Sequence, residues 1–295
     1  MEAPFTEYVH DDPRLTKEER KSVTHGEFWI PEHERGVYQL ALRTLNDAGV
    51  PFVVSGLYAI YEYTGIYRQT KDLDLFFEPE QIIPAARALR AAGFRTELEQ
   101  DHWLAKAFKG DILVDLIFGM GNGLAFIDAP WYEHSRAGIL AATQVRVAPP
   151  EELLWHRLFV SERHRYDMAD IVHLILTRGD ELNWERILAR ADEHWRLLLA
   201  QIHLFDYCYP GRRGRIPEWV REELFERAYE GLRQEPEPDV CQGTMISRFS
   251  FTIDVNEWGF HNVRAEEVAA ARENPIIREI RESDVWDRNS HEPDR

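Results

Sequence analysis

The sequence predicts an α/β fold in which a small mixed sheet with flanking helices is followed by a helical domain. Strand-like and helical segments alternate over residues 34–148, and only helical periodicity is found from residue 151 to 233. Residues 72–77 place two acids on one face of a strand and three apolar side chains on the other. The chain has 295 residues, 44% of them hydrophobic, which is enough for one large domain or two ordinary ones.

The overall charge limits the classes of partner. The chain carries 35 basic and 52 acidic residues and a net charge of -17, which argues against broad binding to duplex DNA, although a local basic groove could hold RNA. Its two cysteines cannot form a disulfide framework or a thiolate zinc site. There is no signal-peptide pattern and no apolar run of transmembrane length, so we expect a cytoplasmic protein without a membrane partner.

The first half of the chain predicts helices and strands in alternation. Residues 34–48 have helical spacing and end before a glycine, and residues 51–54 indicate a strand. Ser55 and Gly56 then form a turn that opens a helix over residues 57–63. Anions bind at the amino end of a helix, so this turn is a candidate phosphate site.

Further strands follow the turn. A helix is expected over residues 79–92, and residues 103–108 and 112–118 predict a hairpin. In the second strand of this hairpin, Asp115 lies between apolar residues on one face. An unpaired charge among apolar side chains is costly, so we expect a cation close to Asp115.

We expect four segments in the chain. They are an N-terminal extension over 1–33, the α/β domain over 34–148, the helical domain over 149–234, and a linker with a C-terminal tail over 235–295. In the tail, apolar and polar residues alternate over 249–255 and predict one strand. The charged residues after Glu282 are expected to be loose.

Asp72 and Asp74 are the leading candidates for chemistry. Two carboxylates on one face of a strand repel each other unless a cation joins them, and an apolar far face holds such a strand rigidly in a core. Together with Asp115, they supply the carboxylates that in-line nucleotidyl transfer with two Mg²⁺ or Mn²⁺ ions requires. Asp115 would complete the ion nearest the nucleophile or accept its proton.

These residues resemble motifs of the nucleotidyltransferase superfamily that includes DNA polymerase beta, in particular its small bacterial members and the AbiEii-like toxins. Those proteins share a Gly-Gly or Gly-Ser turn opening a helix, an Arg-x-Thr-x-Asp-hydrophobic-Asp strand and a third Asp on a later strand. Here the corresponding residues are Ser55-Gly56, the run from Arg68 to Asp74, and Asp115. The resemblance covers roughly residues 36–178 and implies a nucleotidyltransferase-like α/β domain.

The resemblance also implies roles for individual residues. The three acids would bind metal and carry the catalysis. The residues expected to meet the NTP, for example ATP, are Ser55, Gly56, Arg68 and Lys71, and then Arg163, Asp167 and Asp170 in a later basic-then-acidic segment.

Structural roles remain the alternative for several of these residues. The acid pair at 72 and 74 could face solvent without a metal, and Arg68 and Lys71 could only balance its charge. Asp167 follows Arg163 by four positions, which is also the spacing of an ordinary ion pair along a helix.

We therefore expect a Mg²⁺-dependent nucleotidyltransferase that moves NMP from an NTP to an unidentified acceptor. The acceptor could be a small molecule, a protein or a tRNA end, and the arginines within residues 212–215 could hold RNA phosphates. A toxin-like role fits the AbiEii resemblance. The alternative is a catalytically inactive nucleotidyltransferase fold acting as a binding or regulatory module, because His156 and Arg157 occur where relatives often carry a lysine.

Overall fold

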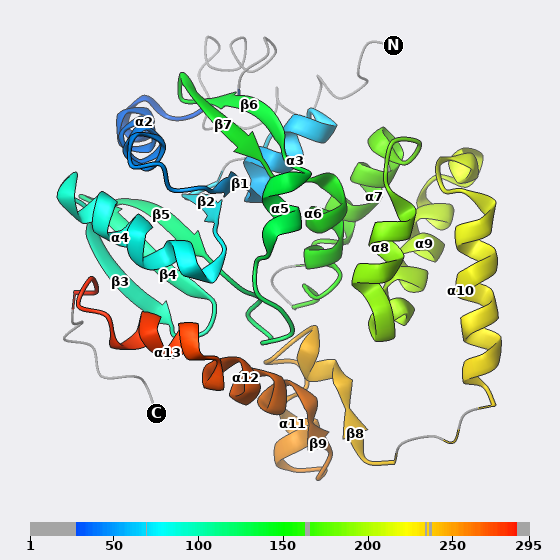
Figure 1. Ribbon diagram of the computed structural model, residues 1–295. Helices are drawn as coiled ribbons and strands as arrows, with labels where there is room; N and C mark the ends of the chain where they lie inside the picture. The colour runs from blue at the N-terminus through cyan, green and yellow to red at the C-terminus, as the bar shows by residue number, and fades with distance from the viewer. Residues whose placement is uncertain (1–27, 69, 163–165, 234, 236–237, 288–295) are drawn as a thin grey trace. The chain divides into compact units, whose positions relative to one another are not determined.

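The computed structural model describes residues 28–68, 70–162, 166–233, 235 and 238–287. These residues form two compact units (Figure 1). The first unit comprises the described parts of Met1–Pro149 and Val268–Arg295, and the second comprises the described part of Pro150–Glu267. The predicted N-terminal extension lies, up to residue 27, outside the described residues. The division into four segments stays a prediction.

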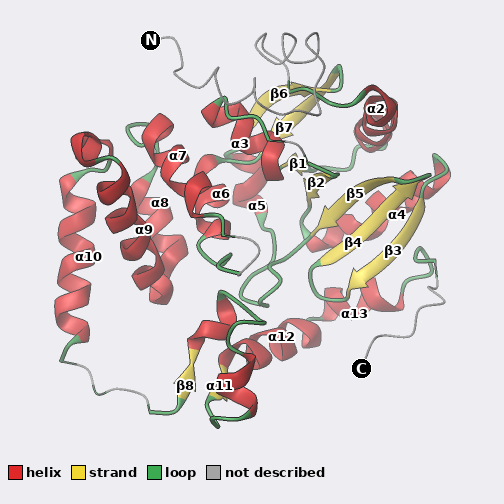
Figure 2. Ribbon diagram, turned by 180° about the vertical axis from the view of Figure 1, so that it is seen from behind, coloured by secondary structure: helices red, strands yellow, loops and turns green. Residues whose placement is uncertain are grey.

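The first unit is built on a mixed sheet. Its strands are β1 Val53–Val54, β2 Asp72–Phe76, β3 Arg95–Gln100, β4 Leu104–Lys109, β5 Ile112–Ile117, β6 Arg136–Leu140 and β7 Thr143–Val147. Within the described residues these seven strands follow the order β3-β4-β5-β2-β1-β7-β6 (Figure 2). The predicted α/β fold with a mixed sheet is confirmed.

Strand β2 lies at the centre of this sheet. It pairs in parallel with β5 and antiparallel with β1, while β3, β4 and β5 pair antiparallel in sequence. On the other side, β1 pairs in parallel with β7, which pairs antiparallel with β6. The hairpin predicted between β4 and β5 is confirmed, and Gly110 in its turn adopts a φ of 61°, which glycine tolerates.

Helices pack on the sheet through apolar stripes. The helices of the first unit are α2 Glu32–Asp47, α3 Gly56–Thr64, η2 Pro79–Gln81, α4 Ile82–Ala91, α5 Ala129–Glu133 and α13 Pro275–Glu282. In α2, Tyr38, Ala41, Leu42 and Leu45 are fully buried at the i, i+3, i+4, i+7 spacing of one helix face. This face packs α2 beside α4 and against β5 and β7 (Figure 1).

The C-terminal segment packs on the same sheet. Ile280 of α13 is fully buried, and Val285 beyond the helix is 3% exposed. The Thr96 hydroxyl on β3 donates a 2.5 Å hydrogen bond to the Val285 carbonyl, and the Asp287 backbone N–H donates to the Thr96 carbonyl at 2.7 Å. The expectation that the chain is loose after Glu282 is therefore wrong for residues 283–287, because these bonds and a buried valine attach them to β3.

The second unit is mainly helical, as predicted. Its elements are α6 Pro150–Arg157, α7 Met168–Arg178, α8 Trp184–Ala191, η3 Asp192–His194, α9 Trp195–Cys208, η4 Pro210–Arg215, α10 Glu218–Gly231, β8 Val240–Cys241, η5 Gln242–Met245, α11 Thr252–Asn256 and β9 His261–Asn262. Helix α12, Val263–Glu273, crosses from this unit into the first. No helix in the described parts of the chain has both the length and the apolar character needed to cross a membrane.

A buried carboxylate joins two of these helices. Glu152 on α6 has no exposed surface, and its Oε1 lies 3.1 Å from Arg186 Nε and 3.8 Å from Arg190 Nη2 on α8. Burial raises the pKa of Glu152 to about 7, although Arg186 favours the charged form. Because a buried acid is tolerated only with partners, this pairing specifies how α6 and α8 meet.

The strand predicted over residues 249–255 is wrong. Helix α11 covers Thr252–Asn256 instead, and Phe249 and Ile253 are 69% and 45% exposed. The alternation there does not bury an apolar face, because no strand of the described chain pairs with this segment. The short parallel pair in this region joins β8 and β9, with Val240 opposite His261.

Replacing Ile280 by alanine tests how far α13 stabilises the first unit. We expect Ile280→Ala to lower the free energy of unfolding by about 2–5 kcal/mol, because it leaves a cavity under a fully buried side chain. Glu279→Ala is the control, since Glu279 is exposed on the same helix. Urea unfolding followed by circular dichroism measures both, and equal stability of the two variants would contradict the packing of α13.

Candidate active site

Strand β2 holds the two acids that the sequence analysis singled out. Leu73 and Leu75 are fully buried, and Asp72 and Asp74 alternate with them on a half-buried face. The Thr70 hydroxyl donates a 2.6 Å hydrogen bond to Asp72 Oδ1. The core side of β2 thus fixes the strand, and Thr70 orients the first acid.

Asp115 comes beside this pair through the pairing of β2 with β5. The parallel register aligns Asp74 with Asp115 and Asp72 with Leu113. Adjacent strands lie about 4.8 Å apart and aligned residues point to the same face, so Asp74 and Asp115 are cross-strand neighbours. The structure therefore brings the three predicted acids together at the centre of the sheet.

The negative charges of these acids repel one another. Burial, followed by the charges of Asp74 and Asp72, raises the pKa of Asp115 to about 7. Lys106, the partner of Asp115 on β4, acts in the opposite direction, but it also faces Glu99 at 3.8 Å. Asp115 Oδ1 is buried and has no hydrogen-bond partner among the described residues. A buried carboxylate whose negative charge is only partly offset by a lysine is stabilised by binding a cation.

The predicted Ser-Gly turn lies directly on the second acid. The Ser55 backbone N–H donates to the Asp74 carbonyl at 3.0 Å, and Ser55 is 1% exposed. Gly56 opens α3 with a φ of 60°. A Cβ on Gly56 would lie 2.7 Å from the Asp74 carboxyl carbon and would overlap its carboxylate. Glycine is required here both by the backbone angle and by the approach of Asp74.

Several polar residues near the acids are not among the predicted site residues. Lys106 alternates on β4 with the buried Ala105 and Ala107, which is a local signal, but its pairing with β5 depends on the hairpin register. On α2, burial and then the Glu34 carboxylate raise the pKa of Tyr38, and the charges of the β2 acids add to this effect. Only the packing of α2 on the sheet brings Tyr38 near β2, whereas the hairpin register places Lys106 beside Asp115.

Arg68 and Lys71 stand just before β2. Both are exposed, and Lys71 immediately precedes Asp72. Their side chains are therefore accessible to solvent, while their contact with a triphosphate stays a prediction.

The later acids of the predicted site lie in the second unit, in a buried ion pair. Arg157 Nε is 3.2 Å from Asp170 Oδ2 and 3.9 Å from Asp167 Oδ2, and all three residues are buried. Removing one partner of a buried pair typically costs about 3–5 kcal/mol, so these acids help to hold the start of α7 to α6. Arg163 lies outside the described residues. The nucleotide-binding roles of Arg163, Asp167 and Asp170 stay predictions.

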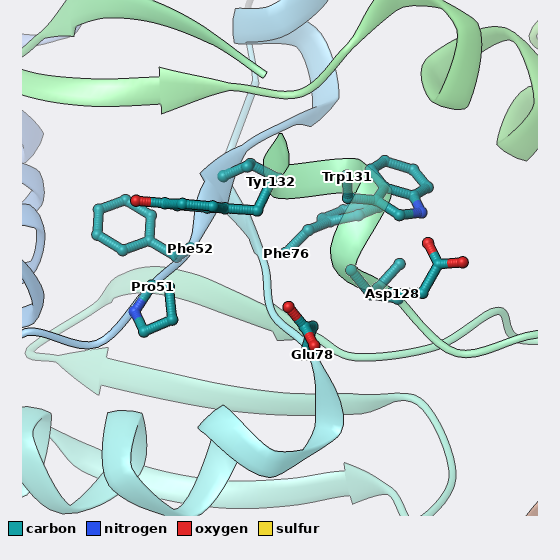
Figure 3. Close-up of a pocket in the computed structure, with 9 residues that line it drawn as sticks. Pro51, Phe52, Phe76, Glu78, Asp128, Trp131 and Tyr132 are labelled. Carbon is teal, nitrogen blue, oxygen red and sulfur yellow. The ribbon is translucent and has the colours of Figure 1, made fainter. Parts of the chain in front are cut away.

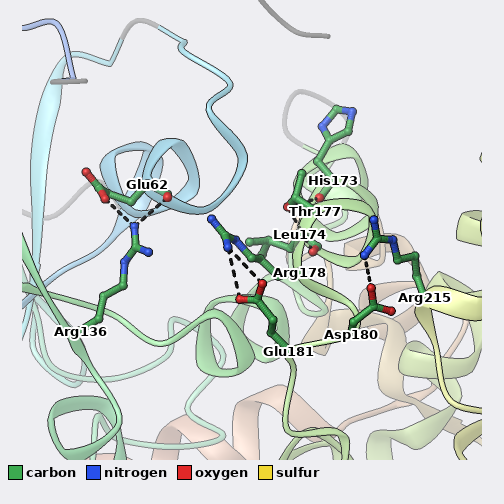
Figure 4. A network of polar contacts seen from close by, with 9 residues as sticks. All are labelled: Glu62, Arg136, His173, Leu174, Thr177, Arg178, Asp180, Glu181 and Arg215. Atoms are coloured by element: carbon green, nitrogen blue, oxygen red, sulfur yellow. Dashed lines mark hydrogen bonds and ion pairs between the residues drawn. The ribbon is translucent and has the colours of Figure 1, made fainter. Parts of the chain in front are cut away.

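The arginines within residues 212–215 lie in η4. Arg215 pairs with Asp180 (Figure 4), and Arg213 Nε is 3.7 Å from Asp206 Oδ2. Acids of the same unit thus offset two of these positive charges, which leaves less net charge for nucleic acid. Their contact with RNA phosphates stays a prediction.

A small pocket lies at the end of β1 and β2 that is remote from the Ser-Gly turn (Figure 3). Its lining is aromatic and acidic and comprises Pro51, Phe52, Val53, Phe76, Glu78, Ile127, Asp128, Trp131 and Tyr132. The cavity measures about 10 Å³, which is at most the room of one water molecule. Burial, followed by the nearby acid Glu80, raises the pKa of Glu78. This pocket is a packing feature and has no room for a nucleotide.

The three acids are neighbours but do not converge. In the parts of the chain that the structure describes, no group of three or more His, Cys, Asp and Glu side chains is gathered as ligands of one metal ion. Asp72 is engaged by Thr70, and Asp74 lies against Gly56. Metal binding by Asp72, Asp74 and Asp115 stays a prediction.

Two acids on a central strand, a third acid on its parallel neighbour and a Ser-Gly turn at a helix start are the features through which the sequence resembles nucleotidyltransferases. The model of a family described as uncharacterised nucleotidyltransferases matches residues 35–205, which is more than half of the chain. The chain belongs to this family, and it is an enzyme of the nucleotidyltransferase class.

Several solved structures are also similar to the chain. The antibiotic-resistance factor ANT(2'')-Ia is 19% identical with a TM-score of 0.39, over 69% of this chain and 97% of that one. The lincosamide antibiotic adenylyltransferase LnuA, bound to lincomycin, is 16% identical with a TM-score of 0.35, over 49% and 96%. JHP933 from Helicobacter pylori is 14% identical with a TM-score of 0.34, over 70% and 100%. At these scores the likeness bears on neither substrate nor mechanism. No curated protein sequence matches the chain significantly.

A methyl group on Gly56 tests the contact between the turn and Asp74. We expect Gly56→Ala to lower the free energy of unfolding by roughly 2–4 kcal/mol, since positive φ and overlap with the carboxylate add together. Gly65→Ala is the matched control, because Gly65 has a φ of 71° with nothing within 4 Å of the added Cβ. This control should lose only about 1 kcal/mol in urea unfolding. Equal losses would disprove the contact.

The pH dependence of stability tests the environment of Asp115. Its pKa of about 7 in the folded chain exceeds the value of about 3.9 in unfolded chains, so the folded state holds the proton more tightly. Wild-type stability should therefore fall as pH rises from about 4 to 7, and Asp115→Asn should be more stable than wild type by about 2–4 kcal/mol at pH 8. We expect this advantage to shrink steadily toward pH 4.5.

Urea unfolding at each pH, with EDTA present, measures this effect. Asp111→Asn serves as control, because Asp111 is exposed in the hairpin turn of the same sheet. If Asp115→Asn is more stable than wild type by the same amount at pH 4.5 and at pH 8, the negative charge of Asp115 does not destabilise the folded state.

Proposed function

We propose that the enzyme is a Mg²⁺-dependent nucleotidyltransferase that moves NMP from an NTP to a hydroxyl or phosphate group of an acceptor and releases pyrophosphate. The observation that carries this proposal is the parallel register of β2 and β5, which aligns Asp74 with Asp115 while Asp72 shares the face of Asp74. In-line transfer to a phosphorus atom requires just such a group of carboxylates.

The donor set suits a hard divalent cation. Carboxylate oxygens are the ligands that Mg²⁺ and Mn²⁺ prefer, and the buried Asp115 Oδ1 lacks a hydrogen-bond partner within the described chain. Asp72, Asp74 and Asp115 would hold the metal. When bound, it would supply charge stabilisation for the phosphates and for the attacking oxygen.

The reaction itself is a displacement at the α-phosphorus. The acceptor oxygen forms a bond to this atom, the bond from the α-phosphorus to the oxygen bridging the β-phosphate breaks, and pyrophosphate leaves with that electron pair. In this proposal Asp115 takes the proton of the acceptor, and the rise of its pKa to about 7 through burial and its acidic neighbours supports this role.

The triphosphate has a candidate site at the turn before α3. Gly56 would let the backbone come close to the ligand, Ser55 would add a hydroxyl, and the helix start favours negative charge. Arg68 and Lys71, both exposed, would pair with phosphate oxygens. ATP is the first nucleotide to test.

The proposed class of acceptor rests on the net charge of the chain. A chain with a net charge of -17 favours a small molecule, a protein or a tRNA end over a long duplex. A toxin-like role is part of the proposal only through the resemblance to AbiEii-like proteins.

Label transfer tests the proposed function. Each α-³²P NTP is incubated with enzyme and Mg²⁺ or Mn²⁺ in the presence of total RNA, cell protein or a small-molecule extract. We expect label in one acceptor class, and a loss of on the order of a thousandfold or more for the double variant Asp72→Asn/Asp74→Asn, because metal-ion catalysis contributes several kcal/mol.

The exposed Asp111→Asn variant is the control and should transfer label like wild type. Transfer that survives in the double variant would remove these acids from the mechanism. No transfer to any acceptor, with metal-dependent NTP binding retained, would instead favour the inactive regulatory module.

A further inference from the structure

The second unit contains a polar cavity that has no part in the proposed transfer. It measures about 250 Å³. It is lined by residues of η5, α11, β9, the start of α12 and the turn after η5, which are Thr244, Arg248, Thr252, Val255, Asn256, Asn262 and Arg264. All of these residues belong to one compact unit, in the orange part of the ribbon toward the C-terminal end of the chain (Figure 1).

The charge of this cavity is opposite to that of the chain. Its lining has two arginines and no carboxylate, although the chain has 52 acids against 35 bases. Among the remaining polar lining residues, the hydroxyls of Thr244 and Thr252 donate to the backbone carbonyls of Cys241 and Arg248, whereas the side-chain amides of Asn256 and Asn262 have N–H groups that can donate hydrogen bonds to a ligand. A cavity with these groups suits an anion that accepts several hydrogen bonds.

Arg248 is held in place through its backbone. The Glu162 carboxylate accepts hydrogen bonds from the Arg248 backbone N–H at 2.9 Å and from the Ser247 hydroxyl at 2.6 Å. The Thr252 hydroxyl donates to the Arg248 carbonyl at 2.8 Å. Within the described chain, the Arg248 guanidinium forms no ion pair, and it lies 5.5 Å from the centre of the Phe249 ring. Glu162 thus accepts a hydrogen bond from the backbone N–H of Arg248 and does not pair with its guanidinium.

The start of α12 adds to the positive character of the cavity. Asn262 Oδ1 accepts a hydrogen bond from the Ala265 N–H at 3.2 Å, which leaves the side-chain amide as a donor. The Glu266 carboxylate in this first turn lies 3.2 Å from His261. Arg264 lies in the first turn of α12, and the amino end of a helix favours negative ligands.

We propose that this cavity binds a small phosphate monoester. A monoester carries a charge of about -1.5 to -2 at pH 7, which two arginines match, whereas a phosphodiester of RNA carries only one charge. Planar guanidinium groups bind phosphate oxygens in pairs. The volume of about 250 Å³ far exceeds the roughly 10–15 Å³ that one water needs, so an organic group attached to the phosphate also fits.

Calorimetric titration of the full chain in EDTA tests this site apart from any metal-dependent one. The probes are inorganic phosphate, AMP and the dinucleotide ApA, whose only phosphate is a diester. We expect saturable one-to-one binding of phosphate and AMP, and at least about tenfold weaker binding of ApA.

Arginine variants locate the binding. Arg248→Ala and Arg264→Ala should each weaken the binding of AMP by at least about tenfold. Arg248→Lys should weaken AMP binding less, because the positive charge stays while the paired hydrogen bonds are lost. Arg233→Ala is the matched control, since Arg233 also lies over an aromatic ring, that of Tyr229, at 4.7 Å. Circular dichroism confirms that each variant is folded.

Three results would overturn the proposal. One is the absence of saturable phosphate and AMP binding to the wild type at millimolar concentration. Another is AMP binding that folded Arg248→Ala and Arg264→Ala retain in full, which would place the ligand elsewhere. The third is ApA or a longer RNA binding as tightly as AMP, which would assign the cavity to a nucleic acid backbone.

Discussion

The repulsion between Asp74 and Asp115 is the constraint on which the rest of the first unit depends. Their strands pair in parallel with these residues aligned, so two carboxylates share one face in a half-buried place. The arrangement persists because Leu73 and Leu75 anchor β2 in the core and because Lys106 offsets part of the charge. Burial of apolar side chains thus stabilises the unit, while repulsion between the carboxylates destabilises it. Such a combination is often found at active sites.

Local patterns in the sequence were sufficient for the elements of this site but not for their pairing. Alternation predicted β2 and its acidic face, and the change from strand to helix periodicity predicted the turn at Ser55 and Gly56. Nothing local specifies that β5 lies parallel to β2, because a strand pattern is the same in either direction. The order of the sheet, and with it the neighbour of Asp115 on β2, depends on contacts between distant segments.

The C-terminal segments show where periodicity fails. Residues 249–255 alternate like a strand, but a strand needs a neighbour, and this segment instead forms a short helix with Phe249 and Ile253 exposed. The charged composition after Glu282 suggested loose chain, yet Val285 is buried through bonds to Thr96 that span nearly two hundred positions. The composition of a segment gives only its average polarity, whereas a single buried side chain such as Val285 can fix the segment against the sheet.

The contact between Gly56 and Asp74 has a thermodynamic consequence. The Asp74 carboxylate lies at the start of α3, where the proposed function places a triphosphate, so the acid is an internal competitor for the nucleotide. A cation that draws Asp74 away from the helix start removes this competition. Under the proposed function, metal and nucleotide are therefore linked ligands, each tightening the binding of the other by the same factor. Such reciprocity would make the metal an activator of substrate binding as well as a participant in the reaction.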